Sequence, residues 1–188
     1  MEKHFNITPL KEFGTNYAEF YKDGRGAIEK LLLEKEGQVA GAFYKEELGD
    51  IDLVWGEITD KQKHKGYGLS HILDKRKAEF MEQGLSESEA EARVLEFAKN
   101  EIGDIIEKGK ITNKPNEATK IETNNYKIIL KQNWQGEPLE NKWLVTAYIK
   151  KEQGESISST PFTKGDNLPL NSNESRAENE LFNSLNKR

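Results

Sequence analysis

The segment Lys61–Lys77 holds the densest group of side chains that could take part in acid–base chemistry or bind an anion. It contains six Lys and Arg residues and two of the chain's three histidines, against one acidic residue, Asp74. Apolar residues at helical spacing predict a helix over Leu69–Met81, with His71 in the first turn and away from the apolar face. The positive field of a helix N-terminus favours a bound phosphate and a neutral imidazole, so His71 could serve as a base.

A plainer interpretation of the same segment is that His71 only caps the helix and the lysines are solvated. His64 lies among those lysines and not on a defined element, so we expect it to matter little. The third histidine, His4, lies close to the start of the chain. Imidazole chemistry is therefore expected at His71.

A second group of polar side chains lies on the predicted final strand, Trp143–Ile149. Period-two alternation places Leu144, Thr146 and Tyr148 on one face of this strand. The preceding strand, Tyr126–Lys131, turns its lysines, Lys127 and Lys131, to one face. If the two polar faces coincide, they form a patch of hydroxyl and ammonium groups. The alternative is that Thr and Tyr are ordinary strand residues here.

A third candidate is the pair Asp50 and Asp52, which point the same way on a predicted strand. Two carboxylates in this arrangement can share a divalent metal. With Gly41–Ala42 upstream, the pair is similar to the Asp-x-Asp strand of a nucleotidyltransferase, although Ala42 replaces the usual Ser and no third carboxylate follows. A solvent-facing pair at the end of a turn is the simpler interpretation, and the one we favour.

Composition restricts what these groups can do. The chain has 188 residues, a formal net charge of −5 and no cysteine, which excludes disulfides, thiolate metal sites and cysteine nucleophiles. No segment reaches the ~20 apolar residues of a membrane helix, and the start lacks an apolar signal region. We therefore expect a cytoplasmic protein without a membrane partner.

The elements that must position these residues predict an α+β fold. Helices are expected near Ala27–Glu36, over Leu69–Met81 and from the capping box at Ser86–Glu89 onward. Strands are expected over Gln38–Tyr44, Ile51–Trp55, Thr119–Glu122, Tyr126–Lys131 and Trp143–Ile149. Helix pairs between strands favour an antiparallel sheet of about four or more strands. The polar, turn-forming sequence after Ser156 predicts a domain over 1–150 and a flexible tail over 151–188, with residues 156–188 dispensable for folding.

Four sequence blocks together resemble one family. They are Phe13–Tyr21, Gly37–Gly56, Gly68–Ile72 and Trp143–Tyr148. As a set they resemble the nuclease domains of phages and mobile elements in the barnase–EndoU–colicin–RelE-like class, over roughly residues 5–150. The resemblance implies N-terminal helices on a four-stranded antiparallel sheet and an endoribonuclease that needs no metal or other cofactor.

In the chemistry that the resemblance implies, the ribose 2′-OH attacks the adjacent phosphorus and leaves a 2′,3′-cyclic phosphate. The resemblance gives His71 as base or acid and Thr146 and Tyr148 as phosphate contacts or proton donors. Lys75, Arg76 and Lys131 are weaker candidates for binding and stabilising the charged substrate. Where such a helix often carries a second histidine, this chain has Arg76 nearby.

The resemblance also implies RNA as the partner, and an inhibitor protein as a further one, for a toxin or effector of a mobile element acting in the producer or in a target cell. An acidic chain offers little general attraction for RNA, so binding would depend on a local basic patch. Two other functions stay open: a metal-dependent nucleotidyltransferase using Asp50 and Asp52, and a catalytically silent domain that docks a protein.

Overall fold

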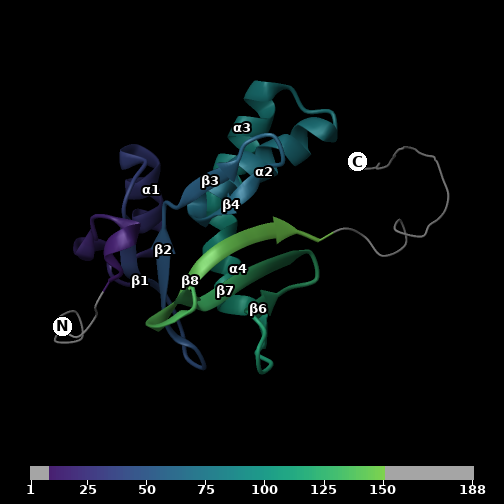
Figure 1. Ribbon diagram of the computed structural model, residues 1–188. Coiled ribbons are helices and arrows are strands. Elements are labelled where there is room, and N and C mark those ends of the chain that lie inside the picture. Colours follow the sequence, from purple (N-terminus) through teal and green to yellow (C-terminus); the bar gives the residue numbers. More distant parts are fainter. Residues whose placement is uncertain (1–8, 151–188) are drawn as a thin grey trace. The chain divides into compact units, whose positions relative to one another are not determined.

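The computed structural model describes residues 9–150, which form the α+β domain expected from the sequence (Figure 1). The main sheet has six strands in the order β1-β2-β8-β7-β6-β5. Their bounds are β1 (Gln38–Lys45), β2 (Gly49–Val54), β5 (Lys110–Thr112), β6 (Thr119–Glu122), β7 (Tyr126–Trp134) and β8 (Glu137–Ile149). A separate hairpin consists of β3 (Glu57–Asp60) and β4 (Lys65–Tyr67). The predicted tail over 151–188 lies outside the described residues.

Four α-helices accompany the strands within the described part of the chain. They are α1 (Gly24–Glu34), α2 (Gly68–Glu82), α3 (Glu87–Glu96) and α4 (Ile102–Lys108). A π-helical turn, Phe97–Glu101, joins α3 to α4, and two short 3₁₀ turns, Lys11–Phe13 and Ala18–Phe20, precede α1. The capping box is present as predicted: the Ser86 hydroxyl accepts from the Glu89 backbone N–H, and the Glu89 carboxylate accepts from the Ser86 N–H.

Both predicted strand pairs are confirmed and lie in the same sheet. β1 pairs antiparallel with β2, and β7 pairs antiparallel with β8. The antiparallel run β8-β7-β6-β5 meets the β1–β2 hairpin through a parallel contact, in which Ile51 lies opposite Lys142 and Asp52 opposite Trp143. The sheet is therefore mixed, and the expectation of a wholly antiparallel sheet is wrong at this one junction. The long connection through α2, α3 and α4 makes the parallel pairing possible.

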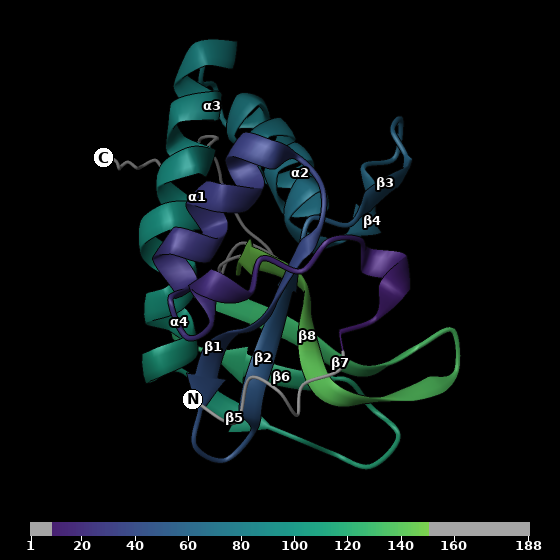
Figure 2. The same ribbon diagram turned by 90° about the vertical axis from the view of Figure 1, so that its left-hand side faces the viewer.

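Helices cover one face of the sheet. Figure 2 shows α1 and α4 on one side of the strands and the β3–β4 hairpin on the other. The main core joins Ile28 and Leu31 of α1, Ile102 and Ile105 of α4, and the inward residues of the strands, including Ile51, Leu53, Ile128, Leu130, Leu144 and Ala147. Most of these side chains are completely buried, so the helices fix the sheet in place and leave chemistry to its other face and its edges.

A bulge in β8 changes which of its side chains face the core. Ile129 pairs with Thr146 but Leu130 pairs with Leu144, so one residue of β8, Val145, is extra. Leu144 and Ala147 both lie in the main core, whereas Trp143 and Val145 belong to a second apolar cluster with Phe13, Val54, Tyr67 and Trp134. The predicted alternation, which grouped Leu144 with Thr146 and Tyr148, is therefore wrong at Leu144, because the bulge resets the faces.

Candidate active site

The end of β2 and the start of α2 are held together by backbone contact. The Ser70 N–H donates to the Trp55 carbonyl over 2.8 Å. Gly56 and Gly68 both have positive φ, and a Cβ on Gly56 would lie 2.0 Å from the Tyr67 carbonyl oxygen. No larger residue fits this approach. The two glycines therefore determine where the first turn of α2 begins.

Arg76, two turns into α2, joins the helix to the last strand. Its guanidinium donates to the Ala147 carbonyl over 2.6 Å and to the Glu79 carboxylate over 3.0 Å, and the side chain is only 3% exposed. Because β2 ends at Val54, it does not cover this part of the β8 edge, and Arg76 takes the place of a neighbouring strand. The burial of Arg76 indicates a role in positioning and electrostatics more than in direct contact with a substrate.

His71 lies on α2 between Ser70, which is bonded to the end of β2, and Arg76, which is bonded to β8. Since Ser70 is tied to the end of β2 and Arg76 to Ala147, α2 runs along β8 in the direction from Trp143 to Ala147. The first turn of the helix therefore lies alongside the stretch of β8 that precedes Ala147, where Thr146 is found. Helix α2 contacts β8 more than it contacts any other strand of the main sheet.

The His71 side chain is 8% exposed, contrary to the expectation that it would lie away from the packed side of the helix. α2 contacts the sheet, α3 and the β3–β4 hairpin, and every residue from 68 to 80 is buried or partly buried, so a position off the apolar stripe is covered as well. Its Nδ1 is completely buried and has no hydrogen-bond partner within residues 9–150. Burial lowers the pKa of His71 first, and the positive charges of Arg76 and Lys75 lower it further, against the opposing effect of Asp74. The imidazole is thus neutral near pH 7, as a general base requires.

Tyr148 is close to two cations on the same side of the sheet. The guanidinium carbon of Arg76 lies 5.6 Å from the centre of the Tyr148 ring, and the Lys127 ammonium lies 6.0 Å from it. Lys127 is directly opposite Tyr148 across the β7–β8 ladder and also forms an ion pair of 3.5 Å with Glu122. Thr146 lies two residues before Tyr148 on β8 and therefore shares its face. The structure thus brings Arg76, Lys127 and Tyr148 together.

Two of the predicted binding residues, Lys75 and Lys131, lie on different elements. Lys75 is next to Arg76 on α2 and acts on the pKa of His71. Lys131 is opposite Trp143, four residues along β7 from Lys127 and hence about 13 Å from it at ~3.3 Å per residue. Lys127 is consequently the β7 cation beside Tyr148. Aligning β7 with β8 in register from the sequence would have identified Lys127 as this cation.

The pair Asp50 and Asp52 is bonded within the protein. The Asp52 carboxylate accepts from the Gly41 N–H over 2.8 Å and from the Asn141 side-chain amide over 3.0 Å, while Asp50 accepts from the Tyr21 hydroxyl over 2.8 Å. Burial raises the pKa of Asp52 to about 6. Within residues 9–150 no group of three or more His, Cys, Asp or Glu side chains could hold a metal ion. These bonds favour a structural role, joining β1, β2 and β8, over the metal site that the sequence left open.

His64 serves a different purpose from His71. Its Nδ1 lies 2.7 Å from the Asp74 carboxylate, and its side chain is 38% exposed. The contact ties the turn of the β3–β4 hairpin to α2.

The structure defines a small α+β domain in which Arg76 and Lys127 lie beside the Tyr148 ring where α2 meets the last strand, and His71 lies in the first turn of the same helix. The family model described as phage-Barnase-EndoU-ColicinE5/D-RelE like nuclease1 matches residues 42–154, which is more than half of the chain. The chain belongs to this family of phage-associated nucleases, as its sequence blocks predicted. The block Phe13–Tyr21 precedes the matched region.

Comparison with curated proteins and with solved structures found no match. In the part of the chain that the structure describes, no helix combines the length and apolarity needed to cross a membrane.

Proposed function

We propose that the protein is a metal-independent endoribonuclease that cleaves RNA by attack of a ribose 2′-OH on the adjacent phosphorus. The observation that carries this proposal is the buried imidazole of His71, whose Nδ1 has no partner within residues 9–150, on the helix that borders the strand carrying Thr146 and Tyr148. The membership of a phage nuclease family supports the reaction class. Toxin or effector activity in the cytoplasm of a host or target cell, with a cognate inhibitor protein, is part of the same proposal.

The reaction needs one proton acceptor, one proton donor and a positive charge near the phosphate. His71 removes the proton of the 2′-OH as the 2′-oxygen forms a bond to phosphorus. The bond from phosphorus to the 5′-oxygen breaks, and Tyr148 supplies the proton to this leaving oxygen. Lys127 stabilises the negative charge on the non-bridging oxygens, and the Thr146 hydroxyl donates a hydrogen bond to one of them. The products are a 2′,3′-cyclic phosphate and a 5′-hydroxyl.

The roles of the charged neighbours follow from their burial. Burial of the imidazole lowers the pKa of His71, and the charge of Arg76 lowers it further; the buried Arg76 also holds α2 against β8. Lys75 adds to the same electrostatic effect. A neutral base at pH 7 together with a nearby cation is what a transphosphorylation without metal requires.

Incubation of a defined RNA with the full chain, with and without excess EDTA, tests the proposal. We expect cleavage that persists in EDTA and products that end in a 2′,3′-cyclic phosphate. A second RNA with 2′-deoxyribose at the cleaved nucleotide is expected to resist cleavage at that position, because the attacking group is absent. Cleavage that stops in EDTA, or that proceeds at the deoxy position, would contradict the mechanism.

A further inference from the structure

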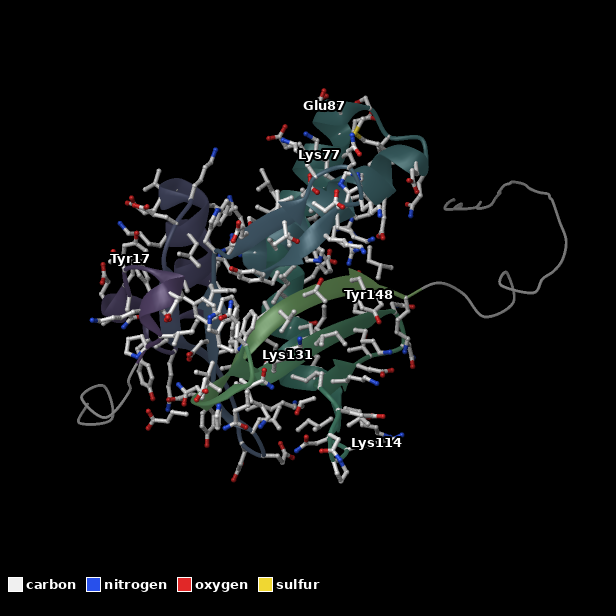
Figure 3. The ribbon with its side chains drawn as sticks, in the orientation of Figure 1. Tyr17, Lys77, Glu87, Lys114, Lys131 and Tyr148 are labelled. Atoms are coloured by element: carbon white, nitrogen blue, oxygen red, sulfur yellow. The ribbon has the colours of Figure 1, made fainter. Side chains whose placement is uncertain are left out.

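A hollow away from His71 lies between the β5–β6 loop and the β7–β8 hairpin. It has a volume of about 580 Å³ and is lined mainly by polar side chains. Those that matter here are Asn113, Lys114, Glu117, Lys131, Asn133 and Lys142. Figure 3 shows Lys131 on the strands between Lys114 below it and Tyr148 above it.

The charge of the hollow is opposite to that of the chain. Three lysines and one carboxylate line it, whereas the whole chain has a formal net charge of −5. Within residues 9–150 neither Lys114 nor Lys131 forms an ion pair, in contrast to Lys30, Lys77 and Lys108, whose ammonium groups lie about 3 Å from carboxylates. Lys142 donates to the Gln132 side-chain amide over 2.7 Å, which holds the ammonium in place without neutralising it. These ammonium groups are available for an anion.

Two paired strands, β7 and β8, run from the hollow to the candidate active site. Lys131 lies opposite Trp143, Ile129 opposite Thr146 and Lys127 opposite Tyr148. The distance of about 13 Å from Lys131 to Lys127 along β7 suits a single strand whose cleaved phosphate lies at Tyr148 and whose neighbouring phosphates lie further along the sheet. Asn113 and Asn133 add neutral groups that can contact sugar or phosphate oxygens.

We propose that this hollow binds the backbone phosphates of the RNA that flanks the cleaved bond. The inference rests on the proposed function, and it adds a second binding region that makes the enzyme prefer long single strands over a minimal substrate. It also accounts for RNA binding by an acidic chain, because the attraction is local and the remaining surface repels the polyanion. Each ammonium that contacts a phosphate releases a counterion, so the contribution of the hollow depends on salt.

The test compares two triple variants of the full chain. The first, Lys114→Gln with Lys131→Gln and Lys142→Gln, removes the three charges of the hollow. The matched control, Lys11→Gln with Lys22→Gln and Lys35→Gln, removes three exposed charges elsewhere. Binding is measured by fluorescence anisotropy with a labelled, fully 2′-O-methylated single strand of about a dozen nucleotides, which cannot be cleaved through the 2′-oxygen. Thermal unfolding monitors the fold of both variants.

We expect the first variant to bind the strand roughly tenfold or more weakly, with the slope of log K against log salt reduced by about 2, at ~0.7 per phosphate contact. The control variant should change neither the affinity nor the salt slope by more than about a third of these amounts. For cleavage of unmodified RNA of the same length, the first variant should raise KM and leave kcat nearly unchanged. Equal effects in both variants, or no change in the salt slope, would overturn the inference.

The two proposals fail in different ways. If the unmodified chain does not cleave RNA but binds the 2′-O-methylated strand through the three lysines, the hollow is an RNA site and the proposed catalytic function is wrong. If RNA is cleaved and the first variant behaves like the control, the catalytic proposal stands and the role of the hollow is refuted.

Discussion

Two clusters of polar side chains, one on β2 and one on α2, differ in how completely their hydrogen bonds are satisfied. In the first, Asp52 accepts two bonds from the protein and Asp50 accepts one. In the second, Nδ1 of His71, Nε of Arg76 and the Ser70 hydroxyl oxygen are buried without a partner among the described residues.

This difference in hydrogen bonding distinguishes a structural cluster from a candidate catalytic cluster. Buried polar groups that are fully bonded hold a fold together, whereas an unsatisfied buried group costs stability and persists where it serves another purpose. Sequence patterns presented both clusters as candidates for catalysis. The bonding of the Asp50 and Asp52 cluster assigns it to the joint between β1, β2 and β8, whereas the cluster at α2 keeps buried polar atoms that have no partner among the described residues.

The largest expected effect contrasts His71 with Asp52 in RNA cleavage. His71→Ala should lower kcat/KM by about a hundredfold or more, since one acid–base group typically contributes ~10²–10⁴-fold. Asp52→Asn should leave the activity of folded protein within about a factor of two, because it has no chemical role in the proposed reaction. Rates are compared at equal folded concentration, measured by circular dichroism. Equal losses in both variants, or full activity in His71→Ala, would contradict the different roles proposed for His71 and Asp52.

Next in size is the stability cost of removing Arg76. Arg76→Met should reduce the free energy of unfolding by roughly 2–4 kcal/mol, since it leaves the Ala147 carbonyl without its donor at a buried strand edge. The control is Arg25→Met, whose guanidinium pairs with Glu29 on an exposed helix face, where about 0–1 kcal/mol is expected. Urea unfolding of both variants gives the two values. Similar losses would mean that Arg76 does not stabilise the β8 edge.

The Asp50 and Asp52 cluster should also affect how the free energy of unfolding depends on pH. Burial raises the pKa of Asp52 from 3.8 to about 6, so the folded state holds this proton more tightly than the unfolded state. The stability that Asp52 contributes is present at low pH and is lost as pH rises from about 4 to about 6. Asp52→Asn keeps the acceptor oxygen, and should therefore raise the free energy of unfolding at pH 7 by roughly 1–3 kcal/mol and change it little at pH 4. A variant equally affected at both pH values would refute this explanation.

His71 should change the stability in the opposite direction as the pH changes. Its pKa is lowered from 6.5, chiefly by burial, so the unfolded state binds this proton more readily. The corresponding stability is present above pH 6.5 and is lost as pH falls below that value toward the folded-state pKa. His71→Gln should weaken the loss of stability on acidification, as followed by thermal unfolding at a series of pH values. An unchanged acid profile would show that the imidazole is not desolvated.

The smallest effect is expected at His64, the histidine outside both clusters. His64→Ala removes a partly exposed contact with Asp74 and should cost at most about 1 kcal/mol, with cleavage nearly unchanged. Urea unfolding and the RNA assay used for His71 measure both quantities. A loss of cleavage comparable to that of His71→Ala would indicate that His64, in the turn of the β3–β4 hairpin, is the general base instead.

Several features of the fold were predictable because they depend on residues close together in the chain. The start of α3 follows from Ser86 and Glu89, which satisfy each other's backbone groups. Strand β6 has the predicted bounds, Thr119–Glu122, and the β1–β2 hairpin follows from apolar runs around a turn. The sequence blocks were also sufficient to identify the nuclease family.

By itself, then, the sequence determined the α+β class, most of the elements and the family, because helix caps, turns and apolar periodicity are local, but it did not predict the β3–β4 hairpin or β5. Only the tertiary structure decided that β2 pairs parallel with β8, that a bulge at Val145 moves Leu144 into the core, and that His71 is buried. It also decided that Arg76 completes the edge of β8 and that Lys127, opposite Tyr148, is nearer the site than Lys131. These outcomes depend on contacts between residues far apart in the chain, where strand register and the packing of one element on another set burial and charge.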